Sequence, residues 1–163
     1  MLPEILKDHA TASAVDSAFA DAVVTGDSAL GEVTLWIDPA HIVAVCRFLK
    51  NEQKFIRLST ITAIDWHLVE PRFEVVYHLH SLDKNERIRL KCKLPGENPE
   101  IDSVTSVWRG ANWYEREVFD LFGIGFRNHP NLTRILLPLD WEGHPLRKDY
   151  PVHGYKYSYP TAE

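Results

Sequence analysis

Three carboxylates stand close together in the segment 111–122, and their spacing decides which chemistry they could perform. They are Glu115, Glu117 and Asp120. A general acid and a general base must converge on one reacting group. In a helix, where each residue turns by about 100°, the side chains of Glu115 and Glu117 point about 160° apart. The spacing therefore argues against a paired-carboxylate active site.

Histidine spacing does not match any zinc-binding pattern either. One group is spread through the C-terminal segment, and the other falls on or near predicted strands. Hydrogen bonding in turns and interfaces is the simpler expectation for the first group. The second group could cluster in space, since two of its members lie on the same face of a strand, but this is a weak basis for a metal site. The two groups are His129, His144 and His153, and His67, His78 and His80.

The two cysteines, Cys46 and Cys92, lie far apart and form no CxxC pair. This chain alone therefore cannot build an iron–sulfur cluster or a zinc knuckle. We expect buried thiols in a reducing compartment. Glycine-rich phosphate-binding loops and the serine-hydrolase motif are also missing from the sequence. The sequence predicts no catalytic apparatus, no cofactor and no metal in this chain.

A helix over about 111–122 must position the three carboxylates. Asn112 has the chemistry of an N-cap, and Gly123 fits a left-handed C-cap. Helical periodicity places an apolar arc toward the core. The residues of that arc are Ala111, Tyr114, Val118, Leu121 and Phe122.

Glu115 falls inside the apolar arc, where a lone carboxylate would cost several kcal/mol. It must therefore be capped or paired. Three interpretations stay open: a capping box with Asn112, a catalytic acid, or an ion pair with an arginine of the following segment. The candidate arginines are Arg127, Arg134 and Arg147.

The opposite arc carries Trp113, Arg116, Glu117 and Asp120. An exposed tryptophan favours a protein interface, although the chain's own tail could cover it equally well. Arg116 and Asp120 are spaced to pair along the helix, which is worth only a few tenths of a kcal/mol. That is too little to explain the crowding of charge, so we expect contacts between subunits.

Residues 127–163 have a different character from the rest of the chain. Prolines at 130, 138, 145, 151 and 160 interrupt any helix. The segment is nevertheless too rich in large apolar side chains for a disordered linker. We therefore divide the chain into an α+β core domain, residues 1–126, and an extended partner-binding tail, residues 127–163. The first tail residues could also pack on the chain's own sheet.

The core domain reads as an α+β two-layer sandwich. Its predicted order is helix, two strands, helix and three strands, which gives a mixed, mostly antiparallel sheet with helices on one face. Asp38 is the expected N-cap of the second helix, which should bury Ile42, Val45, Cys46 and Leu49. The last strand should bury Ile88, Leu90 and Cys92. The expected ranges are 2–9, 19–25, 32–37, 39–51, 55–68, 72–79 and 87–93.

Length and charge exclude several classes of protein. The chain has 163 residues and a net charge of −5. No apolar run approaches the roughly 20 residues that span a bilayer, and the N-terminus predicts no signal peptide. Residues 84–93 are basic but alternate like an exposed strand, so we expect a solvated face and no nucleic-acid binding. Any membrane association should come through a partner.

The segment 115–124 reads EREVFDLFGI, and related motifs follow at 129–136 and 145–150. This pattern closely resembles the NuoC family, the C-type subunits of respiratory complex I, the NADH:quinone oxidoreductase. The resemblance is strong over 108–151, and upstream only the order of elements and the segment 70–79 are similar. With Trp113, the motif positions are expected to be structural and interface residues without catalytic roles. They are Glu115, Arg116, Glu117, Asp120, His129, Arg134, Arg147, Lys148 and Asp149.

The resemblance implies a place in the peripheral arm, on the cytoplasmic side of the bacterial inner membrane. It implies that this chain holds no cofactor and that partner subunits carry FMN and the iron–sulfur clusters. Two neighbours are expected above all: the D-type protein, which resembles a hydrogenase large subunit and forms the quinone site, and the B-type protein, which holds the terminal cluster. The I-type protein is a further expected neighbour. NADH and quinone would be reached only through the complex.

Related complexes and other classes of protein give the alternatives. Similar subunits occur in membrane-bound hydrogenases, in a coenzyme F420-linked dehydrogenase and in the photosynthetic complex fed by ferredoxin. The segment 141–152 resembles the NADH branch most. A free-standing enzyme would instead show activity and a bound metal in the isolated chain. A nucleic-acid module built on 87–93 would show salt-dependent binding, which the net charge disfavours.

Overall fold

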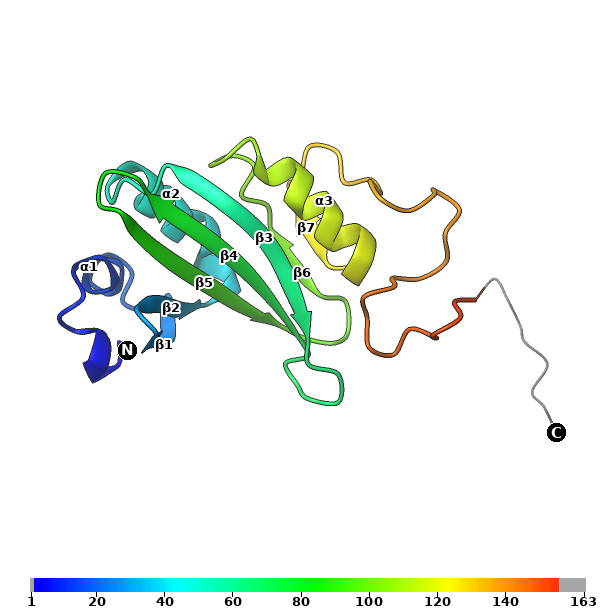
Figure 1. Cartoon of the computed structure of the whole chain (residues 1–163), viewed down its shortest axis with the longest axis horizontal. Coiled ribbons are helices and arrows are strands. Elements are labelled where there is room, and N and C mark those ends of the chain that lie inside the picture. The colour runs from blue at the N-terminus through cyan, green and yellow to red at the C-terminus, as the bar shows by residue number, and fades with distance from the viewer. Residues whose placement is uncertain (1, 156–163) are drawn as a thin grey trace.

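The computed structural model describes residues 2–155, and its centre is a five-stranded sheet (Figure 1). Residues 156–163, the last part of the expected tail, lie outside the described residues. The elements in chain order are η1 (Glu4–Leu6), α1 (Ala10–Ala18), β1 (Val23–Ala29), β2 (Glu32–Ile37), η2 (Pro39–His41), α2 (Ile42–Asn51), β3 (Arg57–Asp65), β4 (Phe73–Ser81), β5 (Glu86–Leu94), β6 (Glu100–Asp102), α3 (Ala111–Phe122) and β7 (Gly125–Arg127).

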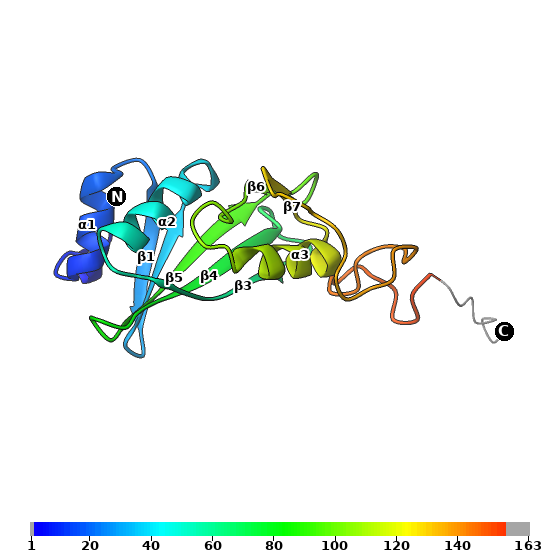
Figure 2. The same ribbon diagram turned by 90° about the horizontal axis from the view of Figure 1, so that it is seen from above.

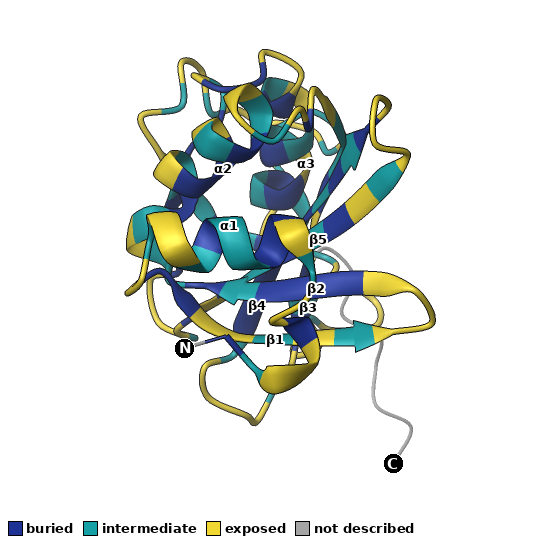
Figure 3. Cartoon of the chain, turned by 90° about the vertical axis from the view of Figure 1, so that its left-hand side faces the viewer, coloured by how far each residue is buried: buried dark blue, intermediate teal, exposed yellow. Residues whose placement is uncertain are grey.

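The large sheet has the strand order β1-β2-β5-β4-β3. Its β2–β5 pair is parallel, and the other neighbours are antiparallel. Figure 3 shows α1, α2 and α3 on the same side of this sheet. The predicted α+β sandwich, with a mixed sheet and helices on one face, is confirmed.

The predicted periodicities place the core correctly in α2 and β5. The four expected residues of α2, Ile42, Val45, Cys46 and Leu49, are all buried. In β5 the side chains alternate, and Ile88, Leu90 and Cys92 are buried toward the helices. The predicted cap at Asp38 is also confirmed, because its carboxylate accepts a hydrogen bond from the Ala40 N–H at 2.8 Å.

The N-terminal boundaries differ from the prediction. The helix expected over 2–9 is only the short turn η1, and the first α-helix, α1, follows it at Ala10. His9 caps α1 by accepting a hydrogen bond from the Ala12 N–H at 3.3 Å. Histidine is not among the usual N-cap residues, which is why the helix start went unrecognised. As a consequence β1 begins at Val23 and runs on to Ala29.

A second, small sheet went unpredicted. It consists of β6 and β7, which pair in parallel on either side of α3 in the sequence. Strands of three residues are too short for a periodic signal. Their pairing brings the start of the 103–110 loop back beside α3, and this position matters for Glu115.

Beyond β7 the described chain, residues 128–155, forms turns and loops without a helix or strand. It first runs back along α3 and then leaves the sheet at one end (Figure 2). Among residues 2–155, no helix is long and apolar enough to cross a bilayer.

Candidate functional site

Asp120 joins α3 to the tail. Its Oδ1 accepts a hydrogen bond from Arg134 Nη1 at 2.7 Å, and its Oδ2 accepts from the N–H groups of Ile135, Leu136 and Leu137 at 3.0, 2.8 and 2.9 Å. Burial alone would raise the pKa of Asp120, but these donors hold it below its ordinary value. The expectation that Asp120 lies on an open polar arc is wrong, because the tail covers it completely.

The pair that the spacing of Arg116 and Asp120 would allow is not formed. Arg116 turns to the tail instead, and its Nε and Nη2 donate to the carbonyl and hydroxyl oxygens of Thr133 at 3.0 and 3.1 Å. Its guanidinium lies 5.3 Å from the centre of the Trp113 ring. The tail carbonyls are fixed acceptors within reach, and they outweigh a solvated pair along the helix.

The C-terminus of α3 is closed by tail residues. Gly123 has φ +71°, as predicted for a left-handed C-cap. Arg147 Nε donates to the Phe122 carbonyl at 2.5 Å, and His144 Nδ1 lies 2.9 Å from the Asp120 carbonyl. These contacts satisfy carbonyls that a helix end leaves free, and a cation there suits the helix dipole.

Gly123 is needed for space as well as for its backbone angle. A Cβ at this position would lie 2.5 Å from the His144 ring and 2.7 Å from the Arg147 guanidinium. Both contacts are far shorter than van der Waals distance. The tail therefore packs on the backbone of the helix end itself.

A second attachment fastens the tail to the β3–β4 end of the sheet. Arg72 donates two hydrogen bonds of 2.8 Å to Asp65 and two of 2.8 and 3.0 Å to Asp149. The Lys148 N–H also donates to Asp65, at 2.9 Å. The Arg72 hydrogen bonds hold the pKa of Asp65 well below its usual range and also lower that of Asp149.

We call this set of contacts the tail anchor: Arg116, Asp120, Arg134, His144, Arg147 and Asp149, together with Asp65 and Arg72. The last two were missed from the sequence. A signal was present, because the segment 70–79 that carries Arg72 was already similar to the family. Nothing in the sequence, however, indicated that a carboxylate of β3 and one of the tail share this arginine.

Glu115 is fully buried and bound by the loop before α3. Ser103 Oγ donates to its Oε2 at 2.6 Å, and the Val104 N–H donates to its Oε1 at 2.7 Å. The capping box is wrong, because α3 begins at Ala111 and Asn112 lies inside it. Burial raises the pKa of Glu115 to about 7, although the two hydrogen bonds oppose this rise.

The ion pair of Glu115 with a tail arginine is also wrong. Arg127 donates to Asp102 at 3.0 Å, while Arg134 and Arg147 belong to the tail anchor. The nearest basic group is His129, whose Nε2 lies 3.9 Å from the carboxylate. Burial lowers the pKa of His129, which favours its neutral form.

The predicted hydrogen bonding of histidines in turns is confirmed for two of them. His129 Nδ1 accepts from the Asn131 N–H at 3.0 Å, and His144 holds the helix end. His78 and His80 point away from the helices, on β4. Within residues 2–155, no group of three or more His, Cys, Asp or Glu side chains is arranged to hold a metal ion.

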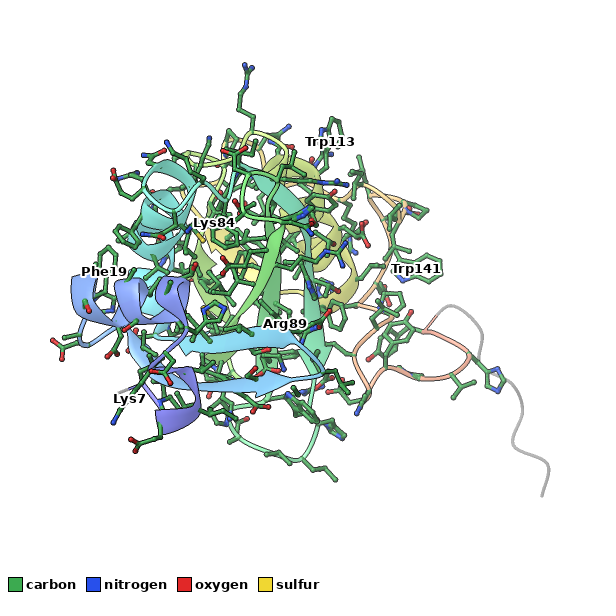
Figure 4. All side chains as sticks on the ribbon, turned by 60° about the vertical axis from the view of Figure 1, so that its left-hand side comes forward. Lys7, Phe19, Lys84, Arg89, Trp113 and Trp141 are labelled. Carbon is green, nitrogen blue, oxygen red and sulfur yellow. The ribbon has the colours of Figure 1, made fainter. Side chains whose placement is uncertain are left out.

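Several large apolar side chains of this region stay at the surface. Trp113 is 58% exposed, and Figure 4 shows it projecting from α3, with Trp141 farther along the tail. Of the two alternatives for Trp113, exposure and cover by the tail, the structure has the first. Leu136, Leu139 and Leu146 are 61%, 86% and 51% exposed. Most of the charged motif residues thus bind the tail to its own chain, and apolar groups are presented outward.

Comparison with known proteins agrees with this sequence pattern. The family described as respiratory-chain NADH dehydrogenase, 30 Kd subunit, matches residues 35–156. The chain belongs to this family. The match includes α3, the tail anchor, the strands β3, β4 and β5, and the last three residues of β2.

Curated relatives are named as C-type subunits of NADH-quinone oxidoreductase. The chain is 46% identical over 136 residues to the protein of that name from Citrifermentans bemidjiense, covering 83% of this chain and 84% of the relative. It is 50% identical over 125 residues to the protein of that name from Geobacter sulfurreducens, covering 76% and 77%. These relatives agree with the membership of the chain in the C-type subunit family.

Two solved structures share the fold. A trypsin-resistant fragment of Nqo5 matches with a TM-score of 0.60 at 33% identity, over 65% of this chain and 86% of the fragment. A chain of the membrane-bound sulfane sulfur reductase, an archaeal respiratory membrane complex, matches with a TM-score of 0.76 at 24% identity, over 93% of each chain. Both relatives support the two-layer architecture, the second by fold alone.

Proposed function

We propose that the chain is a scaffold subunit of the peripheral arm of a proton-translocating NADH:quinone oxidoreductase and supplies no redox centre. One observation carries this proposal: five charged motif residues make internal contacts that hold the tail in place, namely Arg116, Asp120, Arg134, Arg147 and Asp149. Side chains engaged in such contacts stabilise the position of the tail, and none of these residues forms a nucleophile–base pair. The apolar groups left outside are the type that docks on other proteins.

The tail anchor explains how such a scaffold would act. Ordering a loose segment on binding costs free energy for each residue that is immobilised. The tail is already bound to α3 and to the sheet. Part of its conformational entropy is therefore lost before a partner binds. We expect the partners to be the D-type and B-type proteins of the complex, with the I-type protein as a further neighbour, on the cytoplasmic side of the bacterial inner membrane.

The scaffold matters because electron transfer and quinone chemistry depend on geometry. FMN and the iron–sulfur clusters would belong to the partner subunits, and the quinone site to the D-type protein. Misplacing reacting groups by even 1 Å can lower a rate by about a hundredfold. A loosened scaffold would therefore reduce turnover without any change to a redox centre.

The test is a native gel of mildly solubilised membranes from the source cell, probed for this chain and stained for NADH dehydrogenase activity. We expect the chain to co-migrate with a large band that oxidises NADH. A large band that reacts only with hydrogenase or ferredoxin substrates would assign the chain to one of the related complexes. Chain found alone at its own mass would overturn the scaffold role.

A further inference from the structure

The sheet has a face turned away from α1, α2 and α3, and no helix of the described residues covers it (Figure 3). We call it the open face. Cross-strand register identifies its side chains, since residues directly opposite each other point the same way. They are Thr25, Asp27 and Ala29 of β1, Glu32, Thr34 and Trp36 of β2, Arg57, Thr60, Thr62 and Ile64 of β3, Glu74, Val76, His78 and His80 of β4, and Arg87, Arg89, Lys91 and Lys93 of β5.

One end of the open face is cationic. Arg57, His80 and Arg87 are direct neighbours in one cross-strand row, and His78 and Arg89 stand in the next. A hollow of about 380 Å³ lies between them. Arg57 and Arg87 stand on either side of His80 in that row, and this concentration of positive charge favours a negative group between the two arginines.

The charges at this end are only partly balanced within the chain. Arg89 forms an ion pair with Glu32 and donates to Thr34 at 3.2 Å. The side chains of Arg57 and Arg87 make no hydrogen bond or ion pair with any residue between 2 and 155. Two guanidinium groups, each with a planar fork of donors, are therefore free to bind carboxylates.

The other end of the open face is apolar. A hollow of about 560 Å³ there is lined by Trp36, Trp66, Val24 and Val69, among others. Trp66, Val24 and Val69 are 45%, 62% and 59% exposed. The lining also includes charged residues: Lys91 and Glu74, which pair at 2.9 Å, and Asp38, Glu70 and Lys93. Because Lys91 and Glu74 neutralise each other, that pair adds no net charge to the apolar surface at this end.

We propose that the open face is a second docking surface and that it binds an acidic segment of a neighbouring subunit. The carboxylates of that segment would meet Arg57 and Arg87, and an apolar side chain beside them would fill the hollow at Trp66. The inference rests on the proposed function, because it needs the chain to sit in a multisubunit complex. It goes beyond that function, because α3 and the tail residues bound to it lie on the other side of the sheet.

The charges on the open face favour an acidic peptide segment as the binding partner. The two arginines that lack partners give this end a local positive charge although the whole chain carries −5. A nucleic acid would meet the carboxylates of Glu32 and Glu74 on the same face, which repel phosphate. A peptide segment can place a few carboxylates opposite the arginines and avoid the acidic groups. Such complementary charges favour the correct partner more than they add affinity.

The experiment uses the assembled complex. Thr62, exposed on the open face halfway along the edge strand β3, is replaced by the photocrosslinker p-benzoylphenylalanine, and the large native band is irradiated and digested for mass spectrometry. We expect a crosslink to a peptide of another subunit that carries at least two Asp or Glu residues. If the chain is in the large band but crosslinks to no subunit, to nucleic acid, or to a peptide without acidic residues, the inference fails and the scaffold role survives.

Charge reversal gives a second readout. Arg57→Glu and Arg87→Glu, each alone, should lower the share of chain in the large band by about tenfold. Changing the crosslinked carboxylates of the partner to lysine should restore it. Arg47→Glu, an equal change at an exposed position of α2, is the matched control and should leave the band unchanged. Equal loss in all three variants, or no loss in either variant of the open face, would overturn the proposal.

Discussion

Asp120 is the residue on which the tail depends most. One fully buried carboxylate accepts four hydrogen bonds from a short stretch of tail, and one of them comes from Arg134. Removing one member of a buried charge pair is costly because the other charge stays desolvated. A substitution at this position should therefore loosen the tail before it disturbs the sheet.

We predict that Asp120→Asn destabilises the chain by about 3 kcal/mol. The amides of Ile135, Leu136 and Leu137 should lose protection in hydrogen exchange, while the sheet keeps its protection. The control is Glu117→Gln on the exposed side of the same helix, which should change stability by less than about 0.5 kcal/mol. Equal stability of the Asp120 and Glu117 variants in urea would contradict the role given to Asp120.

Glu115 is the residue whose charge depends most on pH. Its pKa rises from 4.5 to about 7 on burial. Between these values the folded chain binds a proton that the unfolded chain has released. The stabilisation of the fold that comes from Glu115 is therefore fully present below pH 4.5 and is lost as pH rises through 7. The free energy of unfolding changes by about 3 kcal/mol in total.

Glu115→Gln should remove that dependence. We expect the free energy of unfolding of the original chain, relative to the variant, to fall between about pH 5 and pH 8 in urea titrations. Subtracting the variant cancels the contributions of the depressed carboxylates Asp65 and Asp120, which titrate at lower pH. A constant difference across this range would show that Glu115 keeps one protonation state.

At the scale of elements, the end of α3 depends on a glycine for two separate reasons. Gly123 has a positive φ and gives His144 and Arg147 room to reach the last carbonyls. Any side chain would strain the backbone and displace both groups. The helix end and the tail therefore form one packed unit, although they were predicted as parts of two domains.

We predict that Gly123→Ala destabilises the chain by at least about 1 kcal/mol, from the left-handed backbone and the lost contacts together. Gly110→Ala is the matched control at the start of the same helix. Gly110 has φ −65° and open space where a Cβ would lie, so its substitution should be neutral or stabilise by about 0.5 kcal/mol. Thermal unfolding of both variants checks the contrast, and equal shifts would refute it.

At the scale of the whole molecule, substitutions of exposed apolar residues should impair assembly without changing the stability of the fold. Exposed apolar residues add little to folding but contribute to interfaces, where a few large side chains supply much of the affinity. Trp113→Ala and Leu139→Ala should therefore leave urea unfolding unchanged and reduce the chain's share in the large native band several-fold. Leu82→Ala, 55% exposed in the β4–β5 turn, is the control. An equal effect of all three would show that the tail side is not a special interface.

Long periodic segments could be predicted from the sequence alone. The pattern of α2 and β5, the Asp38 cap and the Gly123 cap depend on neighbours within a few residues, and the structure has all four. The unusual pattern of α3 and the following motifs also sufficed to indicate the family. These features depend on residues that are close together in the sequence, so periodicity and residue type indicate them directly.

Partners far apart in sequence were decided only by the tertiary structure. Asp120 is buried because residues 134–137 return to it, and Glu115 is bound by Ser103 because β6 pairs with β7. Arg72 joins Asp149, 77 residues later. For Asp120 and Glu115 helical geometry indicated which way the side chain points. In all three cases the identity of the group that the side chain meets depended on how distant segments fold over one another.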